Sequence, residues 1–276
     1  GITLCGLTPF NVACPIVTDP QEVRSADVLI FAVKTYDMAA TLTSLRHIDA
    51  KTVLSLQNGV LKDEQLLTVF GQKTVGTAAS FSGEILPEGL ALFTFNLCVY
   101  LGELPQGVSE RVEQIVQAIS RAGIHAAATP NIRGIEWSKF VNWIGAMALS
   151  VLTRMKTHQF FLDPDTAKIG VQLMRETAAI AIRQGIELED QPFMVRTISR
   201  ATESEAIETL HQLGKKLKDL SPIHRMSILV DLQRGRSLEV EETLGYVVSR
   251  AAALNLSVPT AEMCYRLIRG INRSQQ

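Results

Sequence analysis

The chain has 276 residues, of which 46% are hydrophobic and 20% are charged, and its formal net charge is −1. This composition is typical of a globular chain that is long enough for two domains. The near-zero charge and the lack of a long run of like charges argue against nucleic acid or an anionic membrane as a main partner. The longest apolar stretch, residues 140–153, is too short to span a bilayer, so we expect a buried helix there.

The first half of the sequence alternates predicted strands and helices. Residues 28–33 (VLIFAV) form a continuous apolar run, typical of a strand buried on both faces of a parallel sheet. The segment 83–104 has extended character around Pro87 and predicts antiparallel hairpin strands. Further strands are predicted over 53–56, 73–80 and 124–128, and helices over 37–45, 63–70 and 109–121. The order of these elements predicts a doubly wound α/β sheet.

From Asn131 onward the sequence pattern is almost entirely helical. Prolines lie near several predicted helix starts, where this residue is tolerated; they are Pro164, Pro192, Pro222 and Pro259. The predicted helices cover residues 132–152, 164–184, 192–200, 202–218, 222–231 and 238–254, with a last one from Thr260. The sequence therefore predicts an α/β half and an all-helical half that meet near residue 130.

The cysteines and histidines do not form a recognisable metal site. None of the cysteines makes a C-x-x-C pair, and no two histidines lie four residues apart. We therefore expect no metal ion. The cysteine pattern also fits no compact disulfide framework, which favours a reducing, cytoplasmic compartment.

The segment 136–142 (EWSKFVN) places Lys139 near the start of a helix that is otherwise apolar. Burial of a lysine among such residues is costly, and its ammonium loses its charge more easily than a solvated one. That property suits a proton donor. The ordinary alternative is a lysine whose stem packs on the apolar surface while its charge stays in water.

A dinucleotide-binding α/β domain normally opens with a strand, a G-x-G-x-x-G loop and a helix, and this sequence contains no such loop. No phosphate-binding loop ending in Gly-Lys-Ser or Gly-Lys-Thr is found either. Two interpretations remain open at this point. Either the sheet binds no nucleotide, or the given chain begins after the loop.

Several short tracts recur in a characteristic order. Residues 26–28 read A-D-V, residues 33–35 read V-K-T and residues 57–60 read Q-N-G-V. Residues 137–139 read W-S-K, and residues 227–241 carry S-x-x-x-D-L-Q-R-G-R-x-x-E-V-E. In this order and spacing they resemble the ketopantoate reductase (2-dehydropantoate 2-reductase) family, over essentially the whole chain.

The resemblance implies two domains with an active site in the cleft between them. Residues 1–130 would form an NADP-binding Rossmann-type domain that lacks its first part. Residues 131–276 would form an all-α substrate and catalytic domain like that of 6-phosphogluconate dehydrogenase. In the family the glycine-rich loop lies upstream of the position of Gly1, so the chain looks N-terminally truncated.

The resemblance also implies roles for two residues that follow predicted strands. Lys34 would face the cofactor, at the strand end where an open α/β sheet places its ligands. Asn58 would bond the nicotinamide ribose or carboxamide. The ordinary interpretations are a solvated lysine after a strand and an Asn-Gly turn residue chosen for positive φ.

By the same resemblance Lys139 matches the general acid of the family, which neutralises the oxygen left negative by hydride delivery and protonates it. Glu239 matches a glutamate that orients the lysine and the substrate, and Ser227 matches a serine that contacts the substrate carboxylate. The ordinary alternative for Glu239 is an exposed acid near a helix N-terminus, and that for Ser227 is a helix-surface serine.

The chain departs from the family where the substrate is held. Asparagines usual in the family are replaced by Trp143 and Met147 after the lysine, by His224 before Ser227, and by Thr157. An apolar site holds a small polyhydroxy acid poorly, so Trp143, Met147 and His224 as substrate-binding residues predict a bulkier or less polar 2-oxo compound. Core packing is the alternative for Trp143 and Met147.

Three functions remain open. The first is a cytoplasmic NADPH-dependent oxidoreductase that reduces a 2-oxoacid or related ketone. The second is a true ketopantoate reductase of pantothenate biosynthesis. The third is a non-catalytic, truncated family member. The expected partner is a small-molecule substrate, without nucleic acid or membrane, and the apolar faces of the helical half favour a homodimer.

Overall fold

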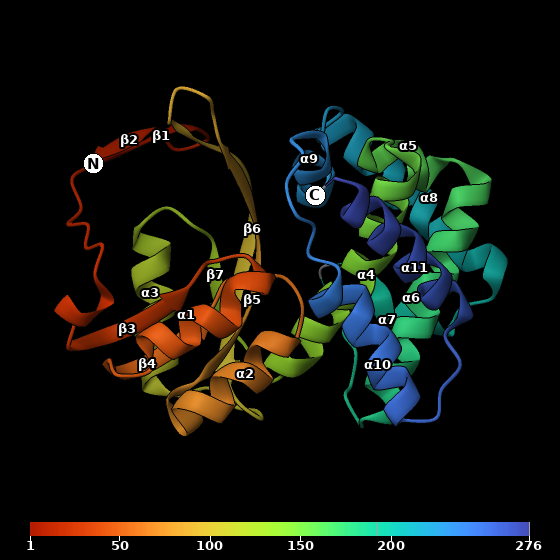
Figure 1. The fold of residues 1–276 in the computed structure, drawn as a ribbon. Coiled ribbons are helices and arrows are strands. Elements are labelled where there is room, and N and C mark those ends of the chain that lie inside the picture. Colours follow the sequence, from red (N-terminus) through yellow and green to blue (C-terminus); the bar gives the residue numbers. More distant parts are fainter. Residues whose placement is uncertain (192, 276) are drawn as a thin grey trace. The chain divides into compact units, whose positions relative to one another are not determined.

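The computed structural model describes residues 1–191 and 193–275. The chain divides into two compact units. The N-terminal unit contains Gly1–Asn58 and Lys62–Arg133, and the helical unit contains Gly59–Leu61 and Gly134–Gln276. The first carries the sheet and the second is helical (Figure 1), so the predicted fold class, an α/β half followed by a helical half, is confirmed.

From residue 25 onward the strands and helices of the N-terminal unit follow the predicted order, except that two predicted strands form one strand over residues 75–85. Two strands before that point were not predicted. The strands are β1 (Ile2–Gly6), β2 (Phe10–Val12), β3 (Ser25–Phe31), β4 (Asp49–Ser55), β5 (Val75–Ile85), β6 (Ala91–Glu103) and β7 (Ala126–Ala128). The helices are α1 (Met38–Leu45), α2 (Leu61–Phe70) and α3 (Glu110–Arg121), with 3₁₀ turns at Pro20–Glu22, Thr35–Asp37 and Gly71–Lys73.

Strand pairing in this unit is mixed. Strands β3 and β4 are parallel, with Phe31 opposite Ser55, and a parallel bridge joins Val53 of β4 to Thr74 before β5. Strands β5 and β6 form a long antiparallel hairpin. The extended pattern over 83–104 predicted its turn and second strand, but the strand expected over 73–80 is not separate and is the first part of β5. On its other side β6 pairs in parallel with β1 and β7, and β2 is antiparallel to β1.

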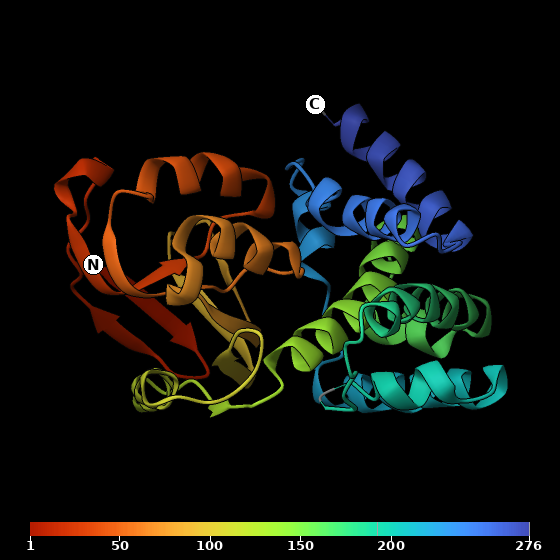
Figure 2. The ribbon, with the colours of Figure 1, turned by 90° about the horizontal axis from the view of Figure 1, so that it is seen from below.

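Neighbouring residues of β4 contribute to different hydrophobic clusters, as alternating side chains of a strand must. Val53 packs with Phe31 and with residues of α1 and α2. Leu54 packs with residues of β5, β6 and α3. Helices α1 and α2 therefore cover one face and α3 the other (Figure 2), which is the layering of a doubly wound sheet.

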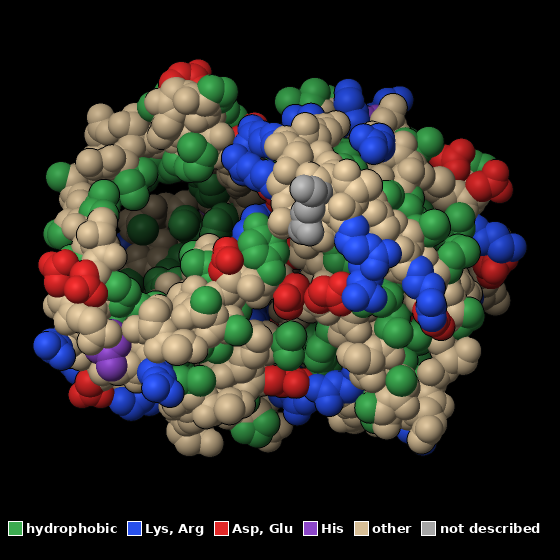
Figure 3. Space-filling model, viewed as in Figure 1, with side chains coloured by type: hydrophobic (Ala, Val, Ile, Leu, Met, Phe, Trp, Pro, Cys, Tyr) green, Lys and Arg blue, Asp and Glu red, His purple; other side chains and the backbone are tan. Residues whose placement is uncertain are grey.

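The first residues of the chain bury little apolar surface. Large apolar side chains there are at least two-fifths exposed: Ile2, Leu7, Phe10, Val12, Ile16 and Val17. Figure 3 shows hydrophobic side chains around a hollow in this part of the molecule. Strands β1 and β2 thus extend the sheet through backbone pairing and add little to the hydrophobic core.

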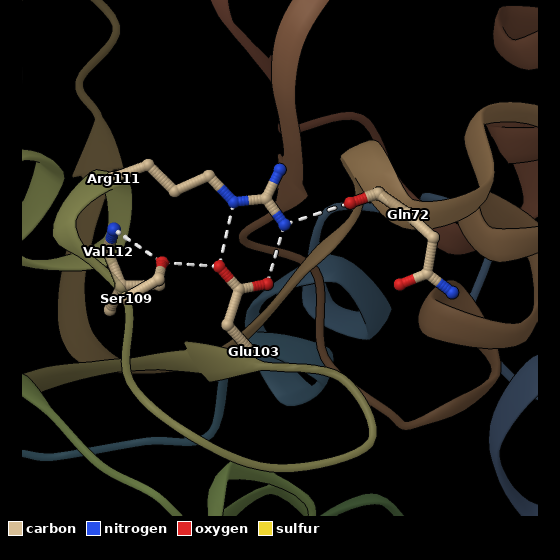
Figure 4. Close-up of polar contacts among 5 residues, drawn as sticks. All are labelled: Gln72, Glu103, Ser109, Arg111 and Val112. Atoms are coloured by element: carbon tan, nitrogen blue, oxygen red, sulfur yellow. Dashed lines mark hydrogen bonds and ion pairs between the residues drawn. The ribbon is translucent and has the colours of Figure 1, made fainter.

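A charged network joins the end of β6 to the start of α3 (Figure 4). Arg111 donates two hydrogen bonds to the Glu103 carboxylate, at 2.7 Å from Nε and 2.5 Å from Nη2, and one to the backbone oxygen of Gln72 at 2.8 Å. Ser109 caps α3 and donates its hydroxyl to Glu103. The Arg111 guanidinium is the main cause that holds the pKa of Glu103 below its ordinary value of 4.5.

This network predicts a pH-dependent stability. A carboxyl whose pKa is lower in the folded protein stabilises it above its unfolded pKa, and this contribution is lost as the pH falls through the folded pKa. At pH 7 we expect Glu103→Gln to lower the free energy of unfolding by about 1–3 kcal/mol. Below about pH 4 the difference in the free energy of unfolding between this variant and the wild type should become smaller. Urea denaturation followed by circular dichroism measures both, and a pH-independent difference would contradict the assignment.

The helical unit contains α4 (Ile132–Thr153), α5 (Thr157–Leu162), α6 (Pro164–Arg183), α7 (Val195–Arg200), α8 (Glu203–Leu220), α9 (Ser227–Gln233), α10 (Tyr246–Ala253) and α11 (Pro259–Ser274), with a π-helical turn at Glu241–Gly245. A single hydrophobic cluster joins them. In the part of the chain that the structure describes, no helix has the length and apolar character needed to cross a membrane.

Several predicted helix bounds in this unit were wrong. The helix expected over 222–231 begins at Ser227, because Met226 is extended and a turn closes before it, where His224 N–H donates to Ser221 O. The helix expected over 238–254 begins with a π turn, in which Gly245 N–H donates to Val240 O. Helix α5 was not predicted. Pro192, expected near the start of the next helix, lies outside the described residues.

Helices α4 and α6 approach closely because glycines face each other. A Cβ at Gly145 would lie 2.9 Å from the Cγ atom of Met174 and 3.3 Å from the backbone oxygen of Gly170. No side chain larger than hydrogen fits such a contact without a shift of its neighbours. This approach fixes α4, which carries Lys139, against the core of the helical unit.

The N-terminus of α11 is held by a buried carboxylate of α6. Glu176 is 6% exposed and accepts hydrogen bonds from the backbone N–H groups of Thr260 and Ala261, at 3.1 and 2.8 Å. These N–H groups belong to the first helical turn, where backbone N–H groups have no acceptor within the helix. The helix dipole also favours an anion at this end.

We expect Glu176→Ala to destabilise the helical unit by about 2–4 kcal/mol, because two buried N–H groups lose a charged acceptor. Both tryptophans of the chain lie in α4, so their fluorescence during urea denaturation reports on this unit. Glu262→Ala is the matched control. Glu262 lies in the first turn of α11 and forms an exposed pair with Arg266, so its loss should cost less than about 1 kcal/mol. Equal losses in both variants would contradict the prediction.

Candidate active site

Two predicted cofactor residues lie beyond the carboxyl ends of paired strands. Lys34 follows β3, which ends at Phe31, and Asn58 follows β4, which ends at Ser55. Because Phe31 and Ser55 are opposite each other in a parallel pair, both residues lie at the same edge of the sheet. Open α/β sheets bind their ligands at this edge.

In the turn after β4, the residue with a positive φ is Gly59 and not Asn58. Gly59 has a φ of +87°, while Asn58 is absent from the described non-glycine residues with positive φ, which are Arg154, Met194 and Asn255. The interpretation of Asn58 as a turn residue chosen for positive φ is therefore wrong. Asn58 is partly buried.

The residues that follow Asn58 belong to the helical unit. A Cβ at Gly59 would lie 3.7 Å from the backbone oxygen of Glu242 and 3.9 Å from Cε2 of Phe140. Val60 is 5% exposed and is part of the large hydrophobic cluster of that unit. Asn58 is thus covalently joined to a segment that packs beside Phe140, the neighbour of Lys139.

Lys139 lies on α4 between two residues of an aromatic cluster. The ring centroids of Trp137 and Phe140 are 5.8 Å apart, and Tyr246 lies 6.3 and 6.2 Å from them. Lys139 itself is partly buried, whereas its neighbours Ser138 and Phe140 are buried. Lys139 thus lies on a segment of α4 whose neighbouring side chains are buried, and reduced contact with water strengthens electrostatic interactions there.

Glu239 is 4% exposed, so the interpretation as an exposed acid near a helix N-terminus is wrong. Its neighbours Leu238 and Val240 are core residues in the same cluster as Trp137 and Phe140. Its backbone oxygen accepts from the Thr243 hydroxyl of the following π turn. One hydrophobic core thus contains the residues that flank Glu239 and those that flank Lys139. A π-helical turn follows Glu239, and such turns often occur at functional sites.

The other polar candidates lie around the start of α9. Ser227 is the first residue of this helix and is exposed. His224 and Thr157, which occupy two asparagine positions of the family, contact each other: the Thr157 hydroxyl lies 2.8 Å from His224 Nδ1, and Thr157 N–H donates to His224 O at 3.1 Å. Burial lowers the pKa of His224, so the imidazole is neutral at pH 7.

Trp143 and Met147 are 7% and 0% exposed and belong to the core of the helical unit. Of the two interpretations that the sequence leaves open, their burial favours core packing over a position in the pocket wall. Where the family usually has two asparagines, this chain thus has two large apolar side chains that fill the core of the helical unit.

The cysteines are free thiols. Burial is the main cause that raises the pKa of Cys98, and it raises that of Cys264, together with the charge of Glu176, to about 11. A thiol that stays protonated is a poor nucleophile, so neither residue is a candidate for covalent catalysis.

Sequence profiles of the ketopantoate reductase PanE/ApbA family match residues 2–106, and those of its C-terminal domain match residues 131–272. A 2-dehydropantoate 2-reductase of Pyrococcus abyssi is 24% identical over 271 residues, which cover 98% of this chain and 84% of that protein. The PanE/ApbA family ketopantoate reductase of Ralstonia eutropha JMP134 has the same fold, with a TM-score of 0.82, 22% identity and coverage of 100% and 86%.

A third similar structure is the ternary complex of D-mandelate dehydrogenase with NADH and anilino(oxo)acetate, with a TM-score of 0.84, 17% identity and coverage of 100% of this chain and 86% of that one. The fold and the sequence profiles agree. The chain belongs to the ketopantoate reductase PanE/ApbA family. It is an oxidoreductase of this family.

Two features of the site were not identified from the sequence. The first is Tyr246, which completes the aromatic cluster beside Lys139. The second is Gln57, whose side chain connects the loops that carry Lys34 and Asn58. Gln57 belongs to the Q-N-G-V tract, but the sequence did not indicate what its side chain contacts.

Proposed function

We propose that the protein is an NADPH-dependent reductase that converts a 2-oxoacid or related ketone to the 2-hydroxy compound, with Lys139 as the general acid. The observation that carries this proposal is that Glu239 is buried between Leu238 and Val240, which belong to the same hydrophobic core as Trp137 and Phe140 beside Lys139. Family membership supports the reaction class. The proposed location is cytoplasmic and the proposed assembly is a homodimer.

The residues at the edge of β3 and β4 fit a nicotinamide nucleotide. An ammonium at Lys34 can pair with an anionic or hydroxyl group, and the amide of Asn58 can both donate and accept hydrogen bonds, as ribose and carboxamide groups require. When bound, the cofactor supplies the hydride. The chain would hold it at this edge through Lys34 and Asn58.

The role of Lys139 is to interact with the substrate oxygen. Negative charge develops on this oxygen as the carbonyl carbon is reduced, and an ammonium within hydrogen-bond distance stabilises that charge and gives up a proton. Glu239 is proposed to orient the ammonium and the substrate, because a buried carboxylate interacts strongly with a nearby positive charge.

The proposal has two candidates for the substrate. Ser227, and the hydroxyl–imidazole pair of Thr157 and His224, are the polar groups proposed to hold its carboxylate and substituent. A neutral imidazole and a hydroxyl offer fewer donors than two amides. We therefore propose a 2-oxo compound that is less polar than ketopantoate. Ketopantoate itself is the second candidate, because the curated relative from Pyrococcus abyssi is a 2-dehydropantoate 2-reductase.

Steady-state assays of the full-length gene product test this proposal. NADPH and NADH are each combined with ketopantoate, with phenylglyoxylate (the 2-oxo form of mandelate) and with aliphatic 2-oxoacids. The highest kcat/KM with NADPH and a less polar 2-oxoacid would support the first candidate, and the highest value with ketopantoate the second. No oxidation of either cofactor by any substrate would support a non-catalytic family member.

A further inference from the structure

The side chain of Gln57 closes the gap between two loops of the N-terminal unit. The backbone pairing of β3 and β4 ends with Leu56 N–H donating to Phe31 O at 2.9 Å. Beyond it, Gln57 Nε2 donates to Val33 O at 2.9 Å. The amide thus adds one further cross-strand bond after the strands end, at the peptide that links Val33 to Lys34.

The orientation of this amide follows from its other partner. Ser55 is fully buried, and its Oγ accepts from Gln57 N–H at 3.2 Å and donates to Gln57 Oε1 at 2.9 Å. Because the hydroxyl gives its only proton to Oε1, the NH₂ group of the amide points toward Val33 O, which can only accept. Gln57 itself is 7% exposed, so an unmet bond there would be costly.

The connection reaches both proposed cofactor residues. Val33 directly precedes Lys34, and Gln57 directly precedes Asn58. The backbone oxygen of Lys34 in turn accepts from Asp37 N–H at 3.0 Å and opens the 3₁₀ turn Thr35–Asp37. One buried side chain therefore fixes the backbone on either side of the space between Lys34 and Asn58.

We propose that Gln57 is a positioning residue, which holds Lys34 and Asn58 at the separation that a nicotinamide nucleotide needs. The inference rests on the proposed function. A cofactor bound by two groups on separate loops loses affinity when either loop is free to move, because binding must then order it. Gln57 removes that cost before the cofactor arrives.

Gln57→Glu tests the proposal. The carboxylate still accepts from Ser55 but no longer donates to Val33 O. The matched control is Asn96→Asp on β6, since Asn96 Nδ2 donates to Gly123 O at 3.0 Å and its Oδ1 accepts from His125 N–H at 3.0 Å. Each variant thus loses one amide-to-carbonyl bond of the N-terminal unit. Ser55→Ala, which frees the amide to rotate, is the second variant if Gln57→Glu does not fold.

The readouts are the Kd for NADPH, from the fluorescence of the nicotinamide, and the KM and kcat of the full-length gene product, at a temperature where every variant is folded. We expect Gln57→Glu to raise the Kd and KM for NADPH roughly tenfold or more, the value for one lost hydrogen bond in a buried site. Asn96→Asp should leave both within about twofold, and the KM for the 2-oxoacid should change little in either variant.

Two results overturn the inference in distinguishable ways. A wild-type protein that binds NADPH, together with an unchanged Kd in Gln57→Glu and Ser55→Ala, would show that Gln57 only stabilises the sheet edge. A wild-type protein that binds neither NADPH nor NADH would overturn the proposed function, and this inference with it.

Discussion

Replacing Lys139 by alanine is expected to lower kcat by about 10²–10⁴-fold, with a much smaller change in the KM of the 2-oxoacid. The ammonium interacts mainly with charge that forms in the transition state, so its loss reduces the rate of reduction more than the affinity for the ground state. Lys139 is partly buried, and reduced contact with water strengthens such an electrostatic interaction.

Two variants sharpen the test of Lys139. Lys139→Arg keeps the charge but carries a group that does not give up its proton in proteins, so kcat should stay low. Lys168→Ala removes an exposed lysine that pairs with Glu203 and should leave kcat unchanged. An unchanged kcat in Lys139→Ala would assign the proton to water or to another group.

The double substitution of Trp143 and Met147 by asparagine should destabilise the helical unit by about 3–5 kcal/mol or more. Both side chains lie in its core, and the shorter amides would leave a cavity and unpaired polar groups in place of apolar contacts. The remaining Trp137 reports the urea midpoint by fluorescence.

The opposite interpretation makes an opposite prediction. If the two positions line the pocket, the amides would lie on the same helix face as Lys139 and would add activity toward ketopantoate in a folded protein. The volume-conserving change Met147→Leu is the control and should cost less than about 1.5 kcal/mol. A folded double variant with new ketopantoate activity would refute core packing.

The sequence identified those elements whose pattern is local. The apolar run at 28–33 predicted β3, and the extended segment around Pro87 predicted the turn and second strand of the β5–β6 hairpin, because burial on two faces and turn formation are both visible over a few residues. Strands β1 and β2 were missed because their apolar residues remain exposed and show no periodic pattern. Their pairing partner, β6, lies far along the chain.

The sequence motifs named the candidate site residues but did not show their surroundings. Lys139 and Glu239 were found through motifs, yet the burial of Glu239 depends on Leu238 and Val240 reaching a core formed by distant helices. The π turn that follows has no sequence signature. The bond between Thr157 and His224 joins residues 67 positions apart, so no local pattern shows it.

The position of Val60 limits how freely the two halves of this protein can be recombined. The helical unit includes Gly59–Leu61. In the sequence, this short segment is separated from the rest of the helical unit by Lys62–Arg133, which belongs to the N-terminal unit. A shortened chain that starts at Gly134, or a chimaera that joins this helical half to the first half of a relative, would lack Val60 or receive a different residue there. Its core would then be incomplete, so the two halves are expected to have changed together during evolution rather than as exchangeable modules.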